Sequence, residues 1–324
     1  MTPTDSTPKE RLVALDQFRG LAILLMLLAN YMEHIRAVPP FLKHAPDLGL
    51  TIIDFIAPAF LFAVGIGFGA SVLRRRNRDG LGKTTQHVAT RAMALVGIGA
   101  LFTVGEHSYG FGAGLAPWGV LQAIGVSILL TYPTLYLPTL ARLGVALALV
   151  FGYQALLDAF WLETVVRSSH AGIQGSLSWT SVLLFATVYS DLFHGKNRRA
   201  YLLLALAMLA AGLALCGPFP VSKHRMSVSF VFIVTASAAL VFAGMDAVAR
   251  RRERALAFLG VWGTNPLVLY ISQLFLLGAF LVPAAPWWHT AGPIWLAVVQ
   301  GAIYLGILYA WGAWLHRKRV YISL

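Results

Sequence analysis

Residues 13–33 read VALDQFRGLAILLMLLANYME, a run in which apolar side chains far outnumber polar ones. A helix that crosses the hydrocarbon core of a bilayer needs about 20 such residues. Further runs of the same character follow at about 50–73, 87–105, 116–136, 141–157, 176–193, 200–217, 227–248, 256–280 and 292–315. The sequence therefore predicts an all-α integral membrane protein, a single polytopic bundle of about ten transmembrane helices.

The composition agrees with lipid as the solvent of most of the chain. Of its 324 residues, 58% are hydrophobic and only 12% are charged, and the mean hydropathy is +0.72. Soluble domains carry roughly 25% charged residues. No connection between the runs is long enough to fold alone, so we expect a polar tail over 1–12 and one transmembrane domain over 13–324. We expect no cleaved signal peptide, and the first run would direct insertion.

Basic residues are distributed unequally between the two sides of the predicted membrane. Nineteen Lys and Arg residues fall in the connections on the side that carries both termini, and five fall on the other side. Cytoplasmic loops of membrane proteins carry such an excess. The pattern predicts that both termini are cytoplasmic and that the first connection faces outward. The net charge of +12 is then a signal of topology, and we expect no nucleic-acid partner.

Several common classes of site are excluded by what the sequence lacks. The single cysteine, Cys216, cannot form an internal disulfide or a cysteine-rich metal site. No Walker A loop, no GxGxxG with an acidic ribose reader and no HExxH is present. We therefore expect no metal site and no ATP-driven pump.

The first connection holds a cluster of polar side chains that needs an explanation. Residues 30–54 read NYMEHIRAVPPFLKHAPDLGLTIID, so Asn30 ends the first run, His44 lies in the connection and Asp54 lies early in the second run. Histidine is the usual general base near neutral pH. A loop histidine can also be without chemical role, but these three residues can reach the same rim. They form a candidate catalytic group.

Other polar residues inside the runs each allow two interpretations. Asp16 and Arg19 share a helix face and could pair as a membrane anchor. Gln122 could join helices, and Gly263, Asn265 and Pro266 could be a simple proline kink. Broken helices at membrane depth also line cavities, into which Asn265 and Tyr270 could point. The basic clusters at 74–76 and 250–254 set topology, or they bind phosphates of a nucleotide-bearing donor.

Eight motifs of the chain, in order, resemble the heparan-α-glucosaminide N-acetyltransferase family of transmembrane acyltransferases. They are RLVALDQFRGLAILLMLLANY, KHAPDLGLTIIDFIAPAFLFAVGIGFGAS, RAMALVGIGALF, WGVLQAIGVSILL, GIQGSLSWTSVLLF, SVSFVFIVTASAALVFAGMD, FLGVWGTNPLVLY and HRKRVYISL. The resemblance implies transfer of an acetyl group from cytosolic acetyl-CoA to an amine or hydroxyl of an extracytoplasmic acceptor, a sugar or glycan. It implies a multi-pass protein of the lipid bilayer, which we expect in a bacterial inner membrane.

The resemblance also assigns roles to residues. His44 would be the catalytic base, Asn30 a second catalytic residue, and Asp54 would hold the tautomer of His44. The residues expected to bind acetyl-CoA, the co-substrate, are Arg19, Arg74, Arg75, Arg91, Gln122, Arg250, Asn265 and Tyr270. The sequence leaves open whether the protein is a monomer or a homodimer.

The chain departs from the family pattern at four places. Asp47 replaces an aromatic residue, Ala123 an arginine, and Gln273 a histidine. The acidic DPEG is replaced by SHAG at residues 169–172, which could alter recognition of a cationic aminosugar. The related acyltransferase-3 superfamily places a histidine late in the first helix, where this chain has Asn30. The alternative function is a transporter or flippase for small molecules or lipid-linked glycans that uses the same cavity.

Overall fold

The computed structural model describes residues 13–108, 118–252, 255–281, 283 and 285–321, and within this part every regular element is a helix. The α-helices are α1 (Val13–Met32), α2 (Ile56–Asp79), α3 (Leu81–Ser108), α4 (Val120–Thr131), α5 (Thr139–Leu156), α6 (Leu162–Val166), α7 (Gly172–His194), α8 (Arg198–Ala214), α9 (Val228–Arg251), α10 (Ala257–Thr264), α11 (Pro266–Leu281) and α12 (Ile294–Arg317). Short helical turns lie between them: η1 (Pro40–Leu42), η2 (Ile52–Phe55), η3 (Tyr132–Tyr136), η4 (Leu157–Trp161), η5 (Ser169–Ala171) and η6 (Pro286–Trp288). The predicted all-α bundle is confirmed.

Each of the ten predicted runs coincides with one helix or with consecutive helices. Among the described residues, seven helices are long and apolar enough to cross a membrane, or eight if a bent pair counts as one span. That pair is α10 and α11, which meet at 79°. Because Pro266 disfavours helical geometry at the preceding residue, Asn265 leaves the helix there with φ −132 and ψ 57. The predicted break is thus confirmed, whereas ten spans and cytoplasmic termini stay predictions.

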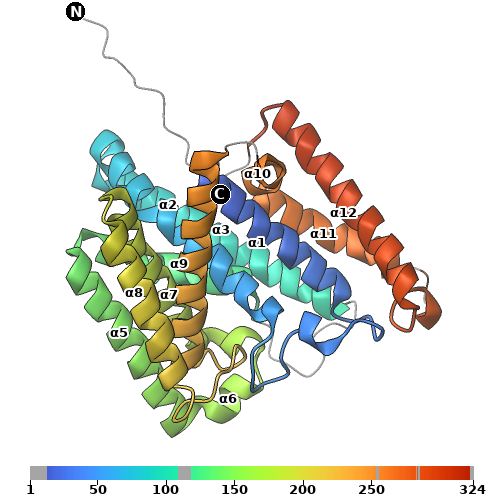
Figure 1. Cartoon of the computed structure of the whole chain (residues 1–324), viewed down its shortest axis with the longest axis horizontal. Helices are drawn as coiled ribbons and strands as arrows, with labels where there is room; N and C mark the ends of the chain where they lie inside the picture. Colours follow the sequence, from blue (N-terminus) through green and yellow to red (C-terminus); the bar gives the residue numbers. More distant parts are fainter. Residues whose placement is uncertain (1–12, 109–117, 253–254, 282, 284, 322–324) are drawn as a thin grey trace, which may run out of the picture.

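The two ends of the bundle differ in character (Figure 1). At one end, which we call the loop end, the connections α1–α2, α8–α9 and α11–α12 gather with α6. Backbone hydrogen bonds join them, from Arg36 to Thr290 (2.8 Å) and from Gly49 to Val221 (2.8 Å). At the other end, the basic end, the start of α1 lies with the last turns of α2, α9 and α12. Those last turns carry the basic clusters predicted to face the cytoplasm.

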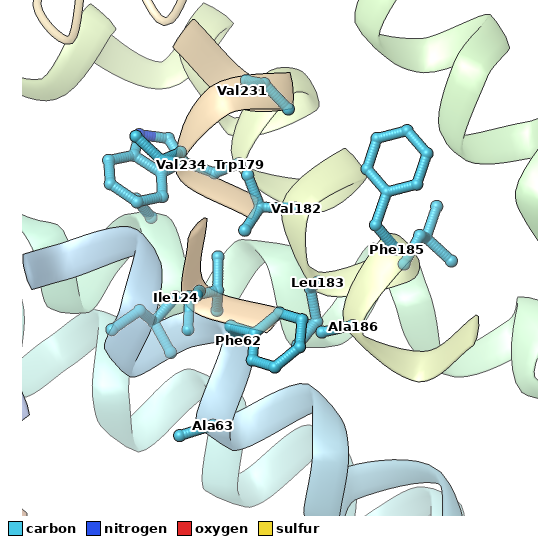
Figure 2. Close-up of a cluster of buried hydrophobic side chains, with 14 of the residues drawn as sticks. Phe62, Ala63, Ile124, Trp179, Val182, Leu183, Phe185, Ala186, Val231 and Val234 are labelled. Carbon is cyan, nitrogen blue, oxygen red and sulfur yellow. The ribbon is translucent and has the colours of Figure 1, made fainter. Parts of the chain in front are cut away.

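Helix α7 runs through the middle of the protein. Its side chains pack with those of α2, α4 and α9, as Phe62, Ile124, Trp179 and Val231 illustrate (Figure 2). The hydroxyls of serine and threonine side chains along α7 donate hydrogen bonds to nearby backbone carbonyls: Thr180 to Ser176 (2.6 Å), Thr187 to Leu184 (2.7 Å) and Ser190 to Ile66 of α2 (2.7 Å). Small polar residues of this kind let helices approach closely in lipid.

A very close contact between helix backbones joins α1 to α10. A Cβ atom built on Gly20 would lie 1.8 Å from the carbonyl oxygen of Leu259, and one on Gly263 would lie 1.9 Å from that of Asp16. Neither atom can be accommodated, and the obstacle in both cases is backbone rather than a movable side chain. The two glycines therefore fix the broken helix against α1, which carries Asn30 at its other end.

We expect Gly263→Ala to destabilise the protein by about 1–3 kcal/mol, because the new methyl group forces the two backbones apart. Gly260→Ala is the matched control, since it lies in the same helix and a Cβ there meets nothing within 4 Å. Thermal unfolding of the detergent-purified proteins is the measurement. Equal melting temperatures for the two variants would contradict the proposed contact.

Candidate active site

A cavity of about 50 Å³ lies under the connections of the loop end. Its walls come from α1, η2, α2, α4, η5 and α11 and from two of the segments between helices. The residues that line it are Met26, Ala29, Asn30, His44, Ile53, Ile56, Ala57, Val120, His170, Lys223 and Tyr270. The structure therefore brings two of the predicted catalytic residues, Asn30 and His44, to one cavity, and Tyr270 joins them from α11.

Asp54 is held rigidly behind His44 by the short turn η2. Its side chain is fully buried, and its Oδ2 atom accepts hydrogen bonds from the backbone N–H groups of Thr51 (2.9 Å) and Ala45 (3.3 Å). The Thr51 hydroxyl also donates to the carbonyl of Lys43 (2.7 Å), which ties the loop to the start of η2. The carboxylate is thus fixed in position and needs no water to satisfy it.

The contact between His44 and Asp54 defines the state of the imidazole. Nδ1 of His44 lies 2.8 Å from Oδ1 of Asp54. An ionised carboxylate can only accept a hydrogen bond, so Nδ1 carries the proton and Nε2 keeps its lone pair. The predicted role of Asp54 in holding the tautomer agrees with this geometry. Nε2 is the atom available to take a proton.

Lys223 is a member of this site that our sequence analysis did not select. Its Nζ atom lies 2.9 Å from Nδ1 and 3.2 Å from Nε2 of His44, and 3.9 Å from Oδ1 of Asp54. Because Nδ1 already donates to Asp54, the ammonium can donate only to Nε2. The signal in the sequence was a basic pair, Lys223 and Arg225, on the side that has few basic residues.

Neighbouring contacts hold the α8–α9 connection in place around Lys223. Arg225 pairs with Asp47 through Nε (2.8 Å to Oδ1), and the Ser222 hydroxyl donates to the same Oδ1 atom (3.1 Å). On the far side, Tyr153 of α5 donates to the carbonyl of Arg225 (2.8 Å). Asp47, the departure from the family's aromatic residue, therefore joins the two loops that cover the cavity. The Arg225 hydrogen bond lowers the pKa of Asp47, so the pair persists at neutral pH.

His170 also lines the cavity and was not selected as a site residue. It and Ala171 have left-handed backbone angles, with φ 53° and 64°. Nδ1 of His170 lies 3.2 Å from the carbonyl oxygen of Trp118, so it carries the proton, and Trp179 of α7 donates to the His170 carbonyl (3.2 Å). Left-handed residues other than glycine persist where their surroundings hold them, and such positions cluster at functional sites.

Burial and charge set the protonation of the two groups above the cavity. The pKa of His44 is lowered overall. Burial lowers this pKa most and the charge of Lys223 lowers it further, and together they outweigh Asp54 and Glu33, which raise it. Burial also lowers the pKa of Lys223 to about 8. At pH 7 the imidazole is therefore neutral and the lysine is mostly charged.

Two residues predicted to meet the donor, Gln122 and Asn265, bind backbone groups and are not among those that line this cavity, and their contact with the donor stays a prediction. Oε1 of Gln122 accepts hydrogen bonds from the backbone N–H of Gly119 and from the Thr103 hydroxyl (3.1 Å), so it caps the start of α4. Asn265 is fully buried, and its Nδ2 donates to the carbonyl of Val320 (2.9 Å). The second contact ties the segment after α12 into the break between α10 and α11.

The predicted arginines lie toward the basic end. Arg75 pairs with Asp79 (3.3 Å), and Arg250 pairs with Asp246 (2.8 Å). Near the start of α1, Arg19 pairs with Asp16 (3.8 Å), as expected of the predicted membrane anchor. Arg19 and Arg75 are close enough to Arg91 for their positive charges to act on it. Arg74 is exposed. The 20 residues of α1, about 30 Å of helix, separate this end from the cavity.

Among the described residues, no group of three His, Cys, Asp or Glu side chains could hold a metal ion. The contacts in this cavity are those of a neutral imidazole, oriented by a buried carboxylate and flanked by an ammonium and a carboxamide. Such a histidine–carboxylate pair activates a hydroxyl or amine as a nucleophile. Fold and site together define a multi-pass membrane protein with a candidate acyl-transfer centre.

Comparison with known proteins agrees with that class. Residues 11–170 match the family model described as heparan-alpha-glucosaminide N-acetyltransferase, catalytic, and over this range the chain is similar to a family whose members are acetyltransferases. The match includes Asn30, His44 and Asp54 and ends at His170; Lys223 and Tyr270 lie beyond it. No curated protein matches the chain.

We expect Lys223→Met to raise the pKa of His44, because the substitution removes a neighbouring positive charge and leaves the charges of Asp54 and Glu33 in place. Diethyl pyrocarbonate modifies the neutral imidazole, so the rate of modification of His44 against pH, followed by mass spectrometry, reports this pKa. Arg36→Gln, which removes an exposed cation from the same end of the protein, is the control. A midpoint that stays in place or falls in Lys223→Met would show that the ammonium does not act on the imidazole.

Proposed function

We propose that this protein transfers an acetyl group from cytosolic acetyl-CoA to an acceptor on the other side of the membrane. The observation that carries the proposal is the geometry of His44. Its Nδ1 is engaged by buried Asp54, its Nε2 keeps a lone pair, and its ring lines a cavity together with Asn30. The similarity of residues 11–170 to an acetyltransferase family supports the same reaction.

In the proposed reaction, the acceptor enters the cavity and takes the place of the Lys223 ammonium at Nε2 of His44. The acceptor oxygen or nitrogen attacks the thioester carbonyl while Nε2 takes its proton. Asp54 stabilises the imidazolium that results, and the imidazolium returns the proton to the departing CoA sulfur. Asn30 can donate a hydrogen bond to the developing oxyanion, a contribution commonly worth about 3 kcal/mol.

The donor would approach from the basic end. Arg74, Arg75, Arg91 and Arg250, which are predicted to face the cytoplasm, provide charge for the nucleotide phosphates. The acyl-bearing arm would then have to pass between the helices to Tyr270, which lines the cavity and stacks on Phe102 of α3 at 4.8 Å. This route fits a bacterial inner membrane, with the loop end in the periplasm and the acceptor arriving from that side.

We expect Asp54→Asn to lower turnover at least about 100-fold, because the amide no longer selects the tautomer with a free Nε2. Transfer of label from acetyl-CoA, measured with purified protein, tests this. Asp47→Asn is the control: it removes a carboxylate that contacts Arg225 rather than His44, and we expect a loss below about tenfold.

His44→Ala should abolish transfer and leave acetyl-CoA binding intact, and near-full activity in His44→Ala would remove the role assigned to the imidazole.

We expect the double variant Arg74→Gln, Arg75→Gln to bind acetyl-CoA more weakly, and the difference from wild type to shrink as salt is raised. Thermal stabilisation by acetyl-CoA is the readout, since a ligand at 100 times its Kd stabilises the folded state by about 2.7 kcal/mol. Arg167→Gln, which removes one exposed arginine at the loop end, is the control. Unchanged stabilisation would limit the two arginines to topology, and absence of stabilisation in the wild type would favour the transporter.

A further inference from the structure

Building on the proposed function, we propose that the acceptor is a hydroxyl group of a neutral or anionic molecule, and that Lys223 and His170 exclude acceptors that arrive as ammonium ions. The family model carries the name of an N-acetyltransferase. The cavity of this chain presents a lysine and a histidine, and no carboxylate, to an acceptor.

The charge that faces the cavity is positive. Among the described residues that line it, Lys223 is the one with a full charge at pH 7, and none is a carboxylate. Like charges repel strongly where water is scarce, so Lys223 would repel an ammonium acceptor, and no carboxylate lines the cavity to bind that acceptor directly. A hydroxyl brings no charge, and a carboxylate or phosphate on the acceptor would be attracted.

The two carboxylates close to the site are already engaged. Asp54 is fully buried, and both its oxygens accept hydrogen bonds from the protein. Glu33 accepts from the backbone N–H of His44 (3.4 Å) and is not among the residues that line the cavity. Neither offers a direct partner to an ammonium in the cavity.

His170 lies in the SHAG segment that replaces the family's acidic DPEG, between Ser169 and Ala171, which stand at the two acidic positions, and it presents an acceptor for a hydroxyl proton. Its Nδ1–H donates to Trp118, so Nε2 keeps a lone pair. A neutral imidazole nitrogen can accept a hydrogen bond from a sugar hydroxyl, but it stabilises an ammonium ion less than a carboxylate would. The fixed backbone of residues 170 and 171 keeps the ring in place.

Lys223 cannot be carried away from the cavity without disrupting the loop around it. The next residue, His224, donates through Nε2 to the carbonyl of Val166 (2.7 Å), and the Met226 carbonyl accepts from Ser178 of α7 (2.8 Å). Ser222, just before it, is tied to Asp47 (3.1 Å). The backbone on both sides of Lys223 is therefore fixed, so the ammonium stays beside the cavity even when its side chain moves off Nε2 of His44 to admit the acceptor.

In the resulting step, the acceptor O–H bond and the thioester C–S bond break, and an ester C–O bond forms. The hydroxyl proton passes to Nε2 of His44 and then to the sulfur, which gives an acetyl ester and free CoA. No oxidant, reductant or further reactant is needed. The products differ from those of N-acetylation in one measurable way, because hydroxylamine cleaves esters and leaves amides.

The test uses purified full-length protein with acetyl-CoA at pH 7 and three sugars of one ring type: N-acetylglucosamine, glucuronate and glucosamine. We expect kcat/KM for the neutral and anionic sugars to exceed that for cationic glucosamine at least tenfold, with hydroxylamine-labile products. Lys223→Met and His170→Asp should each reduce this preference at least tenfold. Arg36→Gln should leave it unchanged.

Preferential formation of an amide on glucosamine by the wild-type protein would overturn the acceptor assignment. A preference that is the same in wild type, Lys223→Met and His170→Asp would overturn the role of these two residues. Failure of the proposed function looks different, because the release of CoA would then be the same in wild type and His44→Ala with every sugar.

Discussion

The hydrogen bond between His44 and buried Asp54 is the interaction on which the site depends. It fixes the tautomer of the imidazole. It also gives the buried carboxylate a hydrogen-bond donor from the protein in place of water. A fully buried carboxylate is costly unless such contacts satisfy it. The turn η2 and the loop before it are therefore built around one anion, and the orientation of the catalytic candidate follows from that requirement.

Much of this local arrangement could be predicted from the sequence, because its parts are neighbours along the chain. Asn30, His44 and Asp54 lie within 25 residues, and the boundary of two apolar runs placed them at one rim. The break at Asn265 and Pro266 was predictable for a similar reason, since proline acts on the residue before it. Such local rules need no knowledge of the tertiary packing.

Lys223 and His170 could not be found in this way. Their approach to the cavity depends on how α7 and α9 pack against α1 and α2, and no local pattern reports that packing. Gln122 and Asn265 show the reverse case: their polarity marked them as candidates, but carbonyl and amide groups released by helix ends engage them. A polar residue in a membrane helix can serve the backbone as well as a ligand.

The contact between His44 and Lys223 joins residues 179 positions apart. The pair formed by His44 and Asp54 can arise as soon as the second helix has left the ribosome, whereas the cover over the cavity requires most of the remaining chain. During biosynthesis His44 and Asp54 can thus pair before Lys223, whose ammonium contacts the imidazole, has been synthesised. The cavity is completed later still, when α11, which carries Tyr270, has been inserted.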